Sequence, residues 1–463
     1  PGLEDDAFYL AAIKKNLHPA LFPHDSDFFQ VPFQATIFDK LIAFSIRLTH
    51  LPVGWGVLLW QFASIFLILW GCWAISRRCF REAHAQWASV AMVAFLLNLP
   101  VTAIGLTLVD QYLHPRAMAT AAILGAIVAV LDRRRGLAAL LLGLALMVHP
   151  TMASFGISLC LFLGWNSRQR YAHTAALALP FGWVFEPASD AYRQAIATRP
   201  TFYHLRQWKW YEWLGVFAPL LLLWVFRQIA RRDRSPMMER LCGRLLAFGV
   251  FQLAVGLVIM LTPSLQRLWP LEPMRFLHLI YLLFFLLAGG LIGQYVLRAR
   301  IYRALLLFVP LAFGMFYAQR QMFPATEHFE WPGTESRNAW VQAFDWIRQN
   351  TPTDSQFAID PYYMALPGED YHGFRALAER SVLADYVKDA GMVARVPHLA
   401  ERWRTEINAQ RNWQKFQPAD FQRLKMQFGV NWVVLARRPS LQPGLAEMPC
   451  PYQNSQVLVC RVE

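Results

Sequence analysis

Runs of about 20 predominantly apolar residues recur along most of this chain, and that length lets a helix cross a hydrocarbon layer of about 30 Å. Clear runs occupy 53–76, 87–109, 117–131, 171–185, 211–230, 241–262, 275–297 and 301–320. Of the 463 residues, 56 % are apolar and only 16 % are charged, which argues against a set of soluble domains. The sequence therefore predicts a mostly α-helical, polytopic transmembrane bundle.

Two further apolar runs, 137–148 and 151–165, are each too short to cross a membrane comfortably. His149-Pro150 separates them, and proline disfavours a continuous helix at that point. We expect two short helices that meet at His149-Pro150 on the side away from the cytoplasm. A single kinked span is the alternative, but it would put basic clusters on opposite sides of the membrane.

The basic residues lie in short clusters between the apolar runs. These clusters are expected to lie on the cytoplasmic side of a membrane protein, so the formal charge of +13 does not indicate a nucleic-acid partner. The clusters contain Arg77, Arg78, Arg81, Arg133, Arg134, Arg135, Arg168, Arg170, Arg231, Arg232, Arg234, Arg240, Arg244, Arg298, Arg300 and Arg303. If every cluster lies on the cytoplasmic side, a single alternation of the spans across the membrane is consistent with all of them. It places the following segments outside the cytoplasm: 1–52, 110–116, 186–210, 263–274 and 321–463.

That alternation gives about ten spans, or eleven with a further span that it requires before Pro1. It also divides the chain into three parts. Residues 1–52 form an extracytoplasmic acidic loop, in which 33–50 is expected to be an amphipathic helix along the interface. Residues 53–320 form the transmembrane domain. Residues 321–463 contain no run long enough to span, and they are expected to form a small extracytoplasmic α/β domain.

In this C-terminal domain, the spacing of apolar residues predicts helices and short strands. The expected helices are 340–350, 373–380, 398–412 and 418–428, and the expected strands are 357–360, 432–435 and 457–462. Cys450 and Cys460 lie ten positions apart. Outside the cytoplasm they could pair across a hairpin, and the alternative is two unpaired thiols.

Two groups of polar residues near the N-terminus are candidate functional groups. Glu4-Asp5-Asp6 could supply a general base for an acceptor hydroxyl or bind a divalent cation, or it could be an ordinary solvated segment. His24 and Asp25 are of metal-ligand type, but their spacing matches no specific metal motif. They could position a sugar or belong to a hydrated turn.

Further candidates lie beside the apolar runs. Asp110, His114 and Arg116 share a short external connection, where Asp110 could contact a sugar and Arg116 a lipid phosphate. Arg275 opens an apolar run and could clamp a lipid-linked phosphate. Snorkelling of both arginines to the interface is the alternative. His149 is expected to face a cavity or to cap the broken backbone.

The chain contains no phosphate-binding glycine-rich loop, no G-x-S-x-G, no C-x-x-C and no H-E-x-x-H motif, which argues against a nucleotide-driven pump. The acidic head, the interface helix and the C-terminal domain together make the whole chain similar to the GT-C superfamily of integral membrane glycosyltransferases. The segments WIRQNTP (346–352), FAIDP (357–361) and AERSV (378–382) also resemble uncharacterised bacterial membrane proteins of this type.

The resemblance implies a bacterial inner-membrane enzyme whose C-terminal domain is outside the cytoplasm. It would transfer a sugar from a polyprenyl-phosphate-linked donor to a glycan, lipid or protein acceptor. Asp5 or Asp6 would be catalytic, Glu4 would contact substrate, and Arg116 or Arg275 would stabilise the departing phosphate. The chain lacks a tryptophan-rich acceptor motif like that of oligosaccharyltransferases, and the 110–116 loop contains no second D-x-D or E-x-D, so a divalent metal cofactor and the class of acceptor are left open. A flippase for lipid-linked glycans and a non-catalytic scaffold for polysaccharide assembly are the alternatives.

Overall fold

The computed structural model describes residues 2–31, 34–164, 188–328, 330–437 and 448–463. The predicted span 171–185, with Arg168 and Arg170, lies outside the described residues. The chain forms two compact units. The α/β unit comprises 1–60, 189–199 and 320–463, and the helical unit comprises 61–188 and 200–319. Two of the four boundaries between the units fall within helices, α4 (Val53–Cys79) and α14 (Ile301–Met322).

Among the described residues, five helical segments are long and apolar enough to cross a membrane, and three shorter apolar helices accompany them. The five are α4 (Val53–Cys79), α11 (Trp210–Arg232), α12 (Pro236–Leu261), the segment Pro273–Leu297 around α13 (Leu277–Ile292), and α14 (Ile301–Met322). The shorter helices are α6 (Pro115–Leu131), α7 (Arg135–Val148) and α8 (Pro150–Gly164). The chain is thus a mostly helical membrane protein, but ten to eleven spans are not confirmed.

The predicted span 87–109 is wrong as a single helix. Its helical part is α5 (Ala83–Phe95), and a short antiparallel pair follows, β1 (Pro100–Val101) with β2 (Leu106–Thr107). Pro100 lacks a backbone N–H and disfavours a helical residue before it. Gly105 has φ +61°, which helical residues do not adopt. Apolar composition alone therefore overestimated the length of this helix.

Small residues bring the helices of this unit close together. Gly289 on α13 and Gly293 directly after this helix face α5, and a Cβ at Gly289 would lie 2.7 Å from the carbonyl oxygen of Ala88. The Ser89 hydroxyl donates to the backbone oxygen of Leu286 at 2.5 Å. Glycine pairs of this spacing let membrane helices approach closely, because nothing projects between the backbones. The helix is interrupted between α7 and α8 at His149-Pro150, as predicted.

The α/β unit contains a five-stranded sheet in the order β4-β3-β5-β7-β6. The strands are β3 (Gln356–Ile359), β4 (Ser381–Val382), β5 (Trp432–Ala436), β6 (Tyr452–Gln453) and β7 (Val457–Arg461). β3 pairs in parallel with β4 and β5, whereas β7 runs antiparallel to β5 and β6. Both faces are buried, since Val434 packs in one apolar core and Val433 in the other. Strands in such a sheet are apolar on both faces.

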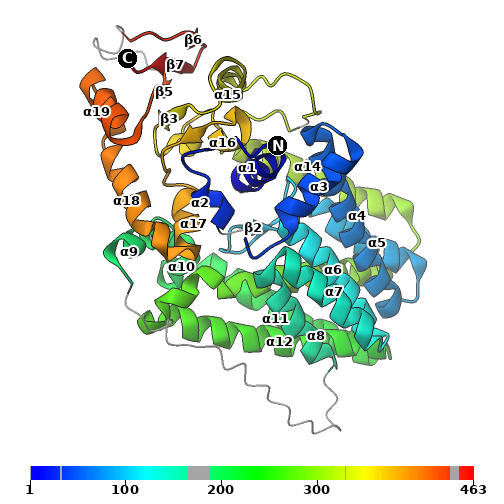
Figure 1. Cartoon of the computed structure of the whole chain (residues 1–463). Helices are drawn as coiled ribbons and strands as arrows, with labels where there is room; N and C mark the ends of the chain where they lie inside the picture. Colours follow the sequence, from blue (N-terminus) through cyan, green and yellow to red (C-terminus); the bar gives the residue numbers. More distant parts are fainter. Residues whose placement is uncertain (1, 32–33, 165–187, 329, 438–447) are drawn as a thin grey trace. The chain divides into compact units, whose positions relative to one another are not determined.

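Some helices of this unit pack on the sheet or connect its strands, and others pack on those helices (Figure 1). The helices are α1 (Asp6–Leu17), α2 (Asp27–Gln30), α3 (Phe38–Thr49), α9 (Asp190–Ala197), α15 (Ala339–Asn350), α16 (Phe374–Ala378), α17 (Asp389–Arg395), α18 (Ala400–Ala409) and α19 (Pro418–Phe428). The sequence predicted α3, α15, α16, α18 and α19, but it missed α1, α2, α9 and α17. α1 is apolar around nearly its whole circumference, so it lacks the periodic stripe that marks a surface helix.

The N-terminal segment is built into the C-terminal domain. The Gly373 N–H donates to the Gly2 oxygen at 2.7 Å, and the Glu4 N–H donates to the Tyr371 oxygen at 2.9 Å. The Lys14 ammonium, buried, pairs with Glu379 at 2.6 Å. Cys450 and Cys460 form a disulfide that joins the segment before β6 to β7. Residues 1–52 and 321–463 therefore belong to one folded unit.

Candidate functional site

The helical unit contains a buried ion pair close to the start of α6. The Arg116 guanidinium donates to both carboxylate oxygens of Asp110, from Nε at 3.1 Å and from Nη2 at 2.5 Å. Both side chains are buried. The Arg116 N–H also donates to Nδ1 of His114 at 2.9 Å, which caps α6. Arg116 and Asp110 therefore do not snorkel to a surface, because each side chain is buried against the other.

His149 lies beside this pair. Its ring centroid is 6.0 Å from that of His114, and its Nδ1 accepts the Met152 N–H at 3.2 Å. His149 therefore does cap the broken backbone at the start of α8, and it also joins the polar groups of the 110–116 connection. Of the two alternatives that the sequence left open for this residue, the contact to Met152 corresponds to capping of the broken backbone.

His278, on the first turn of α13, adds an acceptor to this region. Its Nε2 donates to the Leu108 oxygen at 2.9 Å, because a carbonyl can only accept. The other ring nitrogen, Nδ1, is therefore the acceptor, and it is buried without a hydrogen-bond partner among the described residues. His278 lies within electrostatic range of Asp110, Arg116 and Arg275.

Arg275 forms a buried ion pair with Glu272, one helical turn before α13. Glu272 has φ +49°, a left-handed conformation that a non-glycine residue adopts rarely. The position of Arg275 at the start of an apolar run marked it as a candidate, but no sequence pattern indicated Glu272 as its partner. We call Asp110, His114, Arg116, His149, Glu272, Arg275 and His278 the polar cluster.

The N-terminal carboxylates lie in the other unit, the α/β unit. The Lys388 ammonium pairs with Glu4 at 2.6 Å and with Asp5 at 2.9 Å. The Asp5 side chain stays 33 % exposed, whereas Asp6 is only 1 % exposed. Asp6 accepts the Gly2 N–H at 2.5 Å, and burial raises the pKa of its carboxyl. Of the two predicted catalytic aspartates, only Asp5 is thus open to a substrate in the described unit.

Asp25 takes part in a buried charge network that the sequence did not reveal. Its carboxylate accepts from Arg375 Nε at 2.5 Å and from the Val382 N–H at 3.1 Å. The same guanidinium donates to both oxygens of Asp389, at 2.8 and 3.0 Å. Asp25 therefore ties the N-terminal segment to α16 and α17. Its neighbour His24 is exposed, and its Nε2 lies 3.1 Å from the Asp354 oxygen.

This network predicts a pH dependence of stability. Burial, together with the nearby negative charge of Asp385, raises the pKa of Asp389 to about 7. The Arg375 guanidinium lowers this pKa, but Arg375 is shared with Asp25. The folded chain then keeps a proton that an unfolded aspartate, with a pKa of about 3.9, has already released. The contribution of Asp389 to the free energy of unfolding is expected to fall with rising pH, by at most about 1.4 kcal/mol per pH unit, and to level off above about pH 7.

This slope is measured by unfolding the α/β unit in denaturant at a series of pH values from about 5 to about 8. Limited proteolysis reports the unfolded fraction at each pH. Asp389→Asn is expected to flatten it. Asp354→Asn, at an exposed aspartate, is the matched control and should leave the slope unchanged. An Asp389→Asn protein with the wild-type slope would contradict the assignment of this proton to Asp389.

The predicted site residues thus fall into two groups. Asp110, His114, Arg116, His149 and Arg275 gather in the helical unit, while Glu4, Asp5, Asp6, His24 and Asp25 lie in the α/β unit. In the part of the chain that the structure describes, no group of three or more histidine, cysteine, aspartate or glutamate side chains is arranged to hold a metal ion.

A family model described as a domain of unknown function, DUF6798, matches residues 338–405. The matched segment runs from the residue before α15 into α18, includes Arg375, Lys388 and Asp389, and overlaps the stretch 346–382. No curated protein matches this chain in sequence.

Among solved structures, the crystal structure of the oligosaccharyltransferase of Archaeoglobus fulgidus in the apo form is similar to this chain. The sequences are 12 % identical, and the TM-score is 0.34. The similarity covers 94 % of this chain and 66 % of the archaeal one, so the chain spans just under two thirds of that protein's length.

Proposed function

We propose that this protein is an integral membrane glycosyltransferase that moves a sugar from a polyprenyl-phosphate-linked donor to an extracytoplasmic acceptor. The observation that carries the proposal is the polar cluster. Two buried arginines, two buried carboxylates and three histidines lie in a unit that is otherwise made of apolar membrane helices. Ionisable groups inside a membrane protein are expensive to bury and usually serve a substrate or ion.

The arrangement of the chain supports an extracytoplasmic site. The α/β unit is assembled from parts of 1–52, 186–210 and 321–463, the same segments that the arginine clusters place outside. The polar cluster likewise brings together the 110–116 connection, the His149-Pro150 break and the start of α13. The Cys450–Cys460 disulfide is typical of an oxidising compartment outside the cytoplasm. We therefore place the protein in the inner membrane with 321–463 outside.

In the proposed reaction, an acceptor oxygen attacks the anomeric carbon of the donor sugar. The bond from that carbon to the lipid phosphate breaks, and the phosphate leaves with the electron pair. The proton of the acceptor hydroxyl must also be removed, and the resemblance to GT-C enzymes assigns that role to Asp5 of the α/β unit, whose carboxylate is partly exposed whereas that of Asp6 is buried. Arg116 and Arg275 stabilise the charge that develops on the phosphate. Nδ1 of His278 can accept a hydrogen bond from a sugar hydroxyl.

The test is transfer of a radiolabelled sugar from a polyprenyl-phosphate donor by the purified full-length protein. Arg116→Lys keeps the charge but loses the two-nitrogen geometry, so we expect the transfer rate to fall by about a hundredfold. Arg78→Lys is the matched control. Arg78 pairs with Asp132 in the same two-nitrogen way, at 2.9 and 2.5 Å, but belongs to a basic cluster that the positive-inside rule assigns to the cytoplasm. Its rate should stay at wild-type level.

Equal rates for the two variants would remove the polar cluster from the reaction. Donor that crosses the bilayer of proteoliposomes without transfer of its sugar would instead favour a flippase. Binding of glycan without transfer or transport would favour a scaffold.

A further inference from the structure

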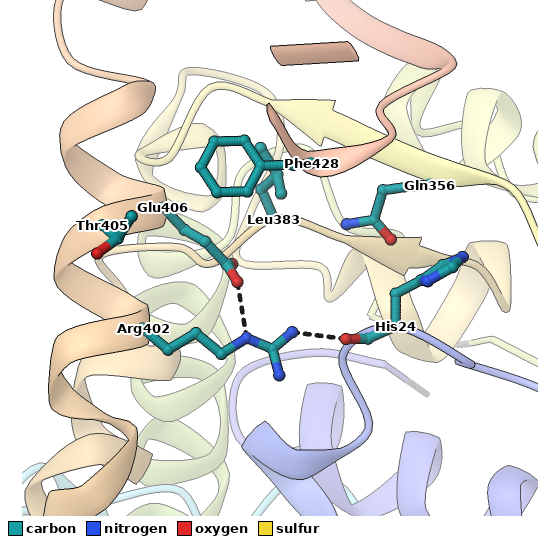
Figure 2. Close-up of a pocket in the computed structure, with 7 residues that line it drawn as sticks. All are labelled: His24, Gln356, Leu383, Arg402, Thr405, Glu406 and Phe428. Atoms are coloured by element: carbon teal, nitrogen blue, oxygen red, sulfur yellow. Dashed lines mark hydrogen bonds and ion pairs between the residues drawn. The ribbon is translucent and has the colours of Figure 1, made fainter. Parts of the chain in front are cut away.

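A pocket of about 380 Å³ opens in the α/β unit, and none of the residues that line it has a role in the proposed reaction (Figure 2). Its walls are His24, Gln356, Leu383, Arg402, Thr405, Glu406 and Phe428. The volume lies within the range of about 300–1,000 Å³ that is usual for sites of small molecules. All the lining residues belong to the α/β unit, so the pocket is complete within one compact body.

The floor of the pocket carries a polar group without a partner. Gln356 begins β3. Its backbone N–H donates to Oδ1 of Asn431 at 3.0 Å, and its backbone oxygen accepts the Asn431 N–H at 3.0 Å. The side chain is only 4 % exposed, and its Oε1 has no hydrogen-bond partner among the described residues. Figure 2 shows the amide pointing into the space between Leu383 and His24. A buried acceptor without a donor is unfavourable, and a ligand hydroxyl would satisfy it.

The charges around the pocket are already compensated. Arg402 donates to Glu406 at 2.8 Å and to the His24 oxygen at 2.5 Å, and it lies 3.3 Å from Asp27. The second carboxylate oxygen of Glu406 accepts the Ala384 N–H at 2.8 Å. An anionic ligand would therefore meet no uncompensated cation on these walls, whereas a neutral molecule with several hydroxyl groups would meet both donors and acceptors.

An apolar wall faces these polar groups. Leu383 is buried, and the half-buried ring of Phe428, at the end of α19, lies across the pocket from His24 in Figure 2. A pyranose ring has one face of C–H groups that packs on an aromatic ring and an edge of hydroxyl groups that form hydrogen bonds. The lining combines both kinds of surface within the space of a small molecule.

We propose that this pocket binds a neutral saccharide, with its C–H face on Phe428 and a hydroxyl donating to Oε1 of Gln356. The inference rests on the geometry of the α/β unit alone, so it does not require that the protein transfer sugar.

Binding is measured on the full-length protein in nanodiscs, by saturation-transfer NMR and calorimetry. The probes are cellobiose, N,N′-diacetylchitobiose and a digalacturonate, which share a size but differ in their N-acetyl groups and charge. We expect one of the two neutral disaccharides to bind at millimolar or better affinity and the acidic one to bind more weakly. No donor lipid is present, so the result is independent of transfer activity.

Gln356→Leu separates binding from structure. It is expected to weaken binding by at least about tenfold and to leave the unfolding midpoint unchanged or higher, because it removes a buried acceptor that has no donor. Gln422→Leu, on the exposed side of α19, is the control and should bind like wild type. Phe428→Ala is expected to weaken binding as well.

Three outcomes would overturn the proposal. They are no binding of any probe by wild type, a preference for the acidic disaccharide, and equal binding by wild type and Gln356→Leu.

Discussion

Asp5→Asn is expected to lower the rate of sugar transfer by at least about a hundredfold, in line with the 10²–10⁴-fold contribution of a positioned general base. Asparagine keeps the size of the side chain and can still accept a hydrogen bond from Lys388, but it cannot take a proton from the acceptor. The measurement is single-turnover transfer at a saturating concentration of lipid-linked donor, so that weaker donor binding does not enter the rate.

Glu4→Gln is the matched control for this prediction. Glu4 and Asp5 pair with the same ammonium group and are about equally exposed. Loss of an ion pair to Lys388 would therefore affect both variants alike, whereas loss of the base would affect only Asp5→Asn. We expect Glu4→Gln to lose less than about tenfold in rate. Similar losses in the two variants would assign Asp5 a structural role.

Arg375→Met is expected to destabilise the α/β unit by about 3–5 kcal/mol, the usual effect of removing one partner from a buried ion pair. Methionine fills much of the space of the arginine stem but leaves the Asp25 and Asp389 carboxylates without their shared cation. The measurement is the urea dependence of proteolysis of the α/β unit in the detergent-solubilised full-length protein.

Arg337→Met supplies the comparison for Arg375→Met. Its side chain is 92 % exposed and forms a loose ion pair with Glu327 at 3.9 Å, so its removal should change stability by less than about 0.5 kcal/mol. If Arg375→Met unfolds within about 1 kcal/mol of wild type, the buried network does not join the N-terminal segment to the C-terminal domain as described.

The membrane helices could be predicted where the apolar runs had clear ends. α4, α11, α12 and α14 follow runs of the right length, and Pro150 marks the break between α7 and α8. The end of α5 was not predictable from hydropathy, since residues 96–109 stay apolar after the helix has ended. In that segment backbone conformation at Pro100 and Gly105 decides the structure, and side-chain polarity does not report it.

The candidate sites were predictable as residue types but not as contacts. Charged residues beside apolar runs stand out in a sequence, and this identified Asp110, Arg116 and Arg275. Their environment depends on residues far along the chain. His278 meets the Leu108 oxygen across 170 positions, and Asp25 meets Arg375 across 350. No local pattern encodes such pairs, so neither the charge network nor the pocket at Gln356 could be foreseen.

The discontinuity of the α/β unit has a consequence for biosynthesis. The segment that bears Asp5, Lys14 and Asp25 is synthesised before its partners Lys388, Glu379 and Arg375. All the candidate membrane helices lie in the sequence between them. The unit can therefore close only after these helices have been synthesised, and until then its N-terminal segment stays exposed to chaperones and proteases. A premature stop before Arg375 would deprive both ends of the chain of a native partner.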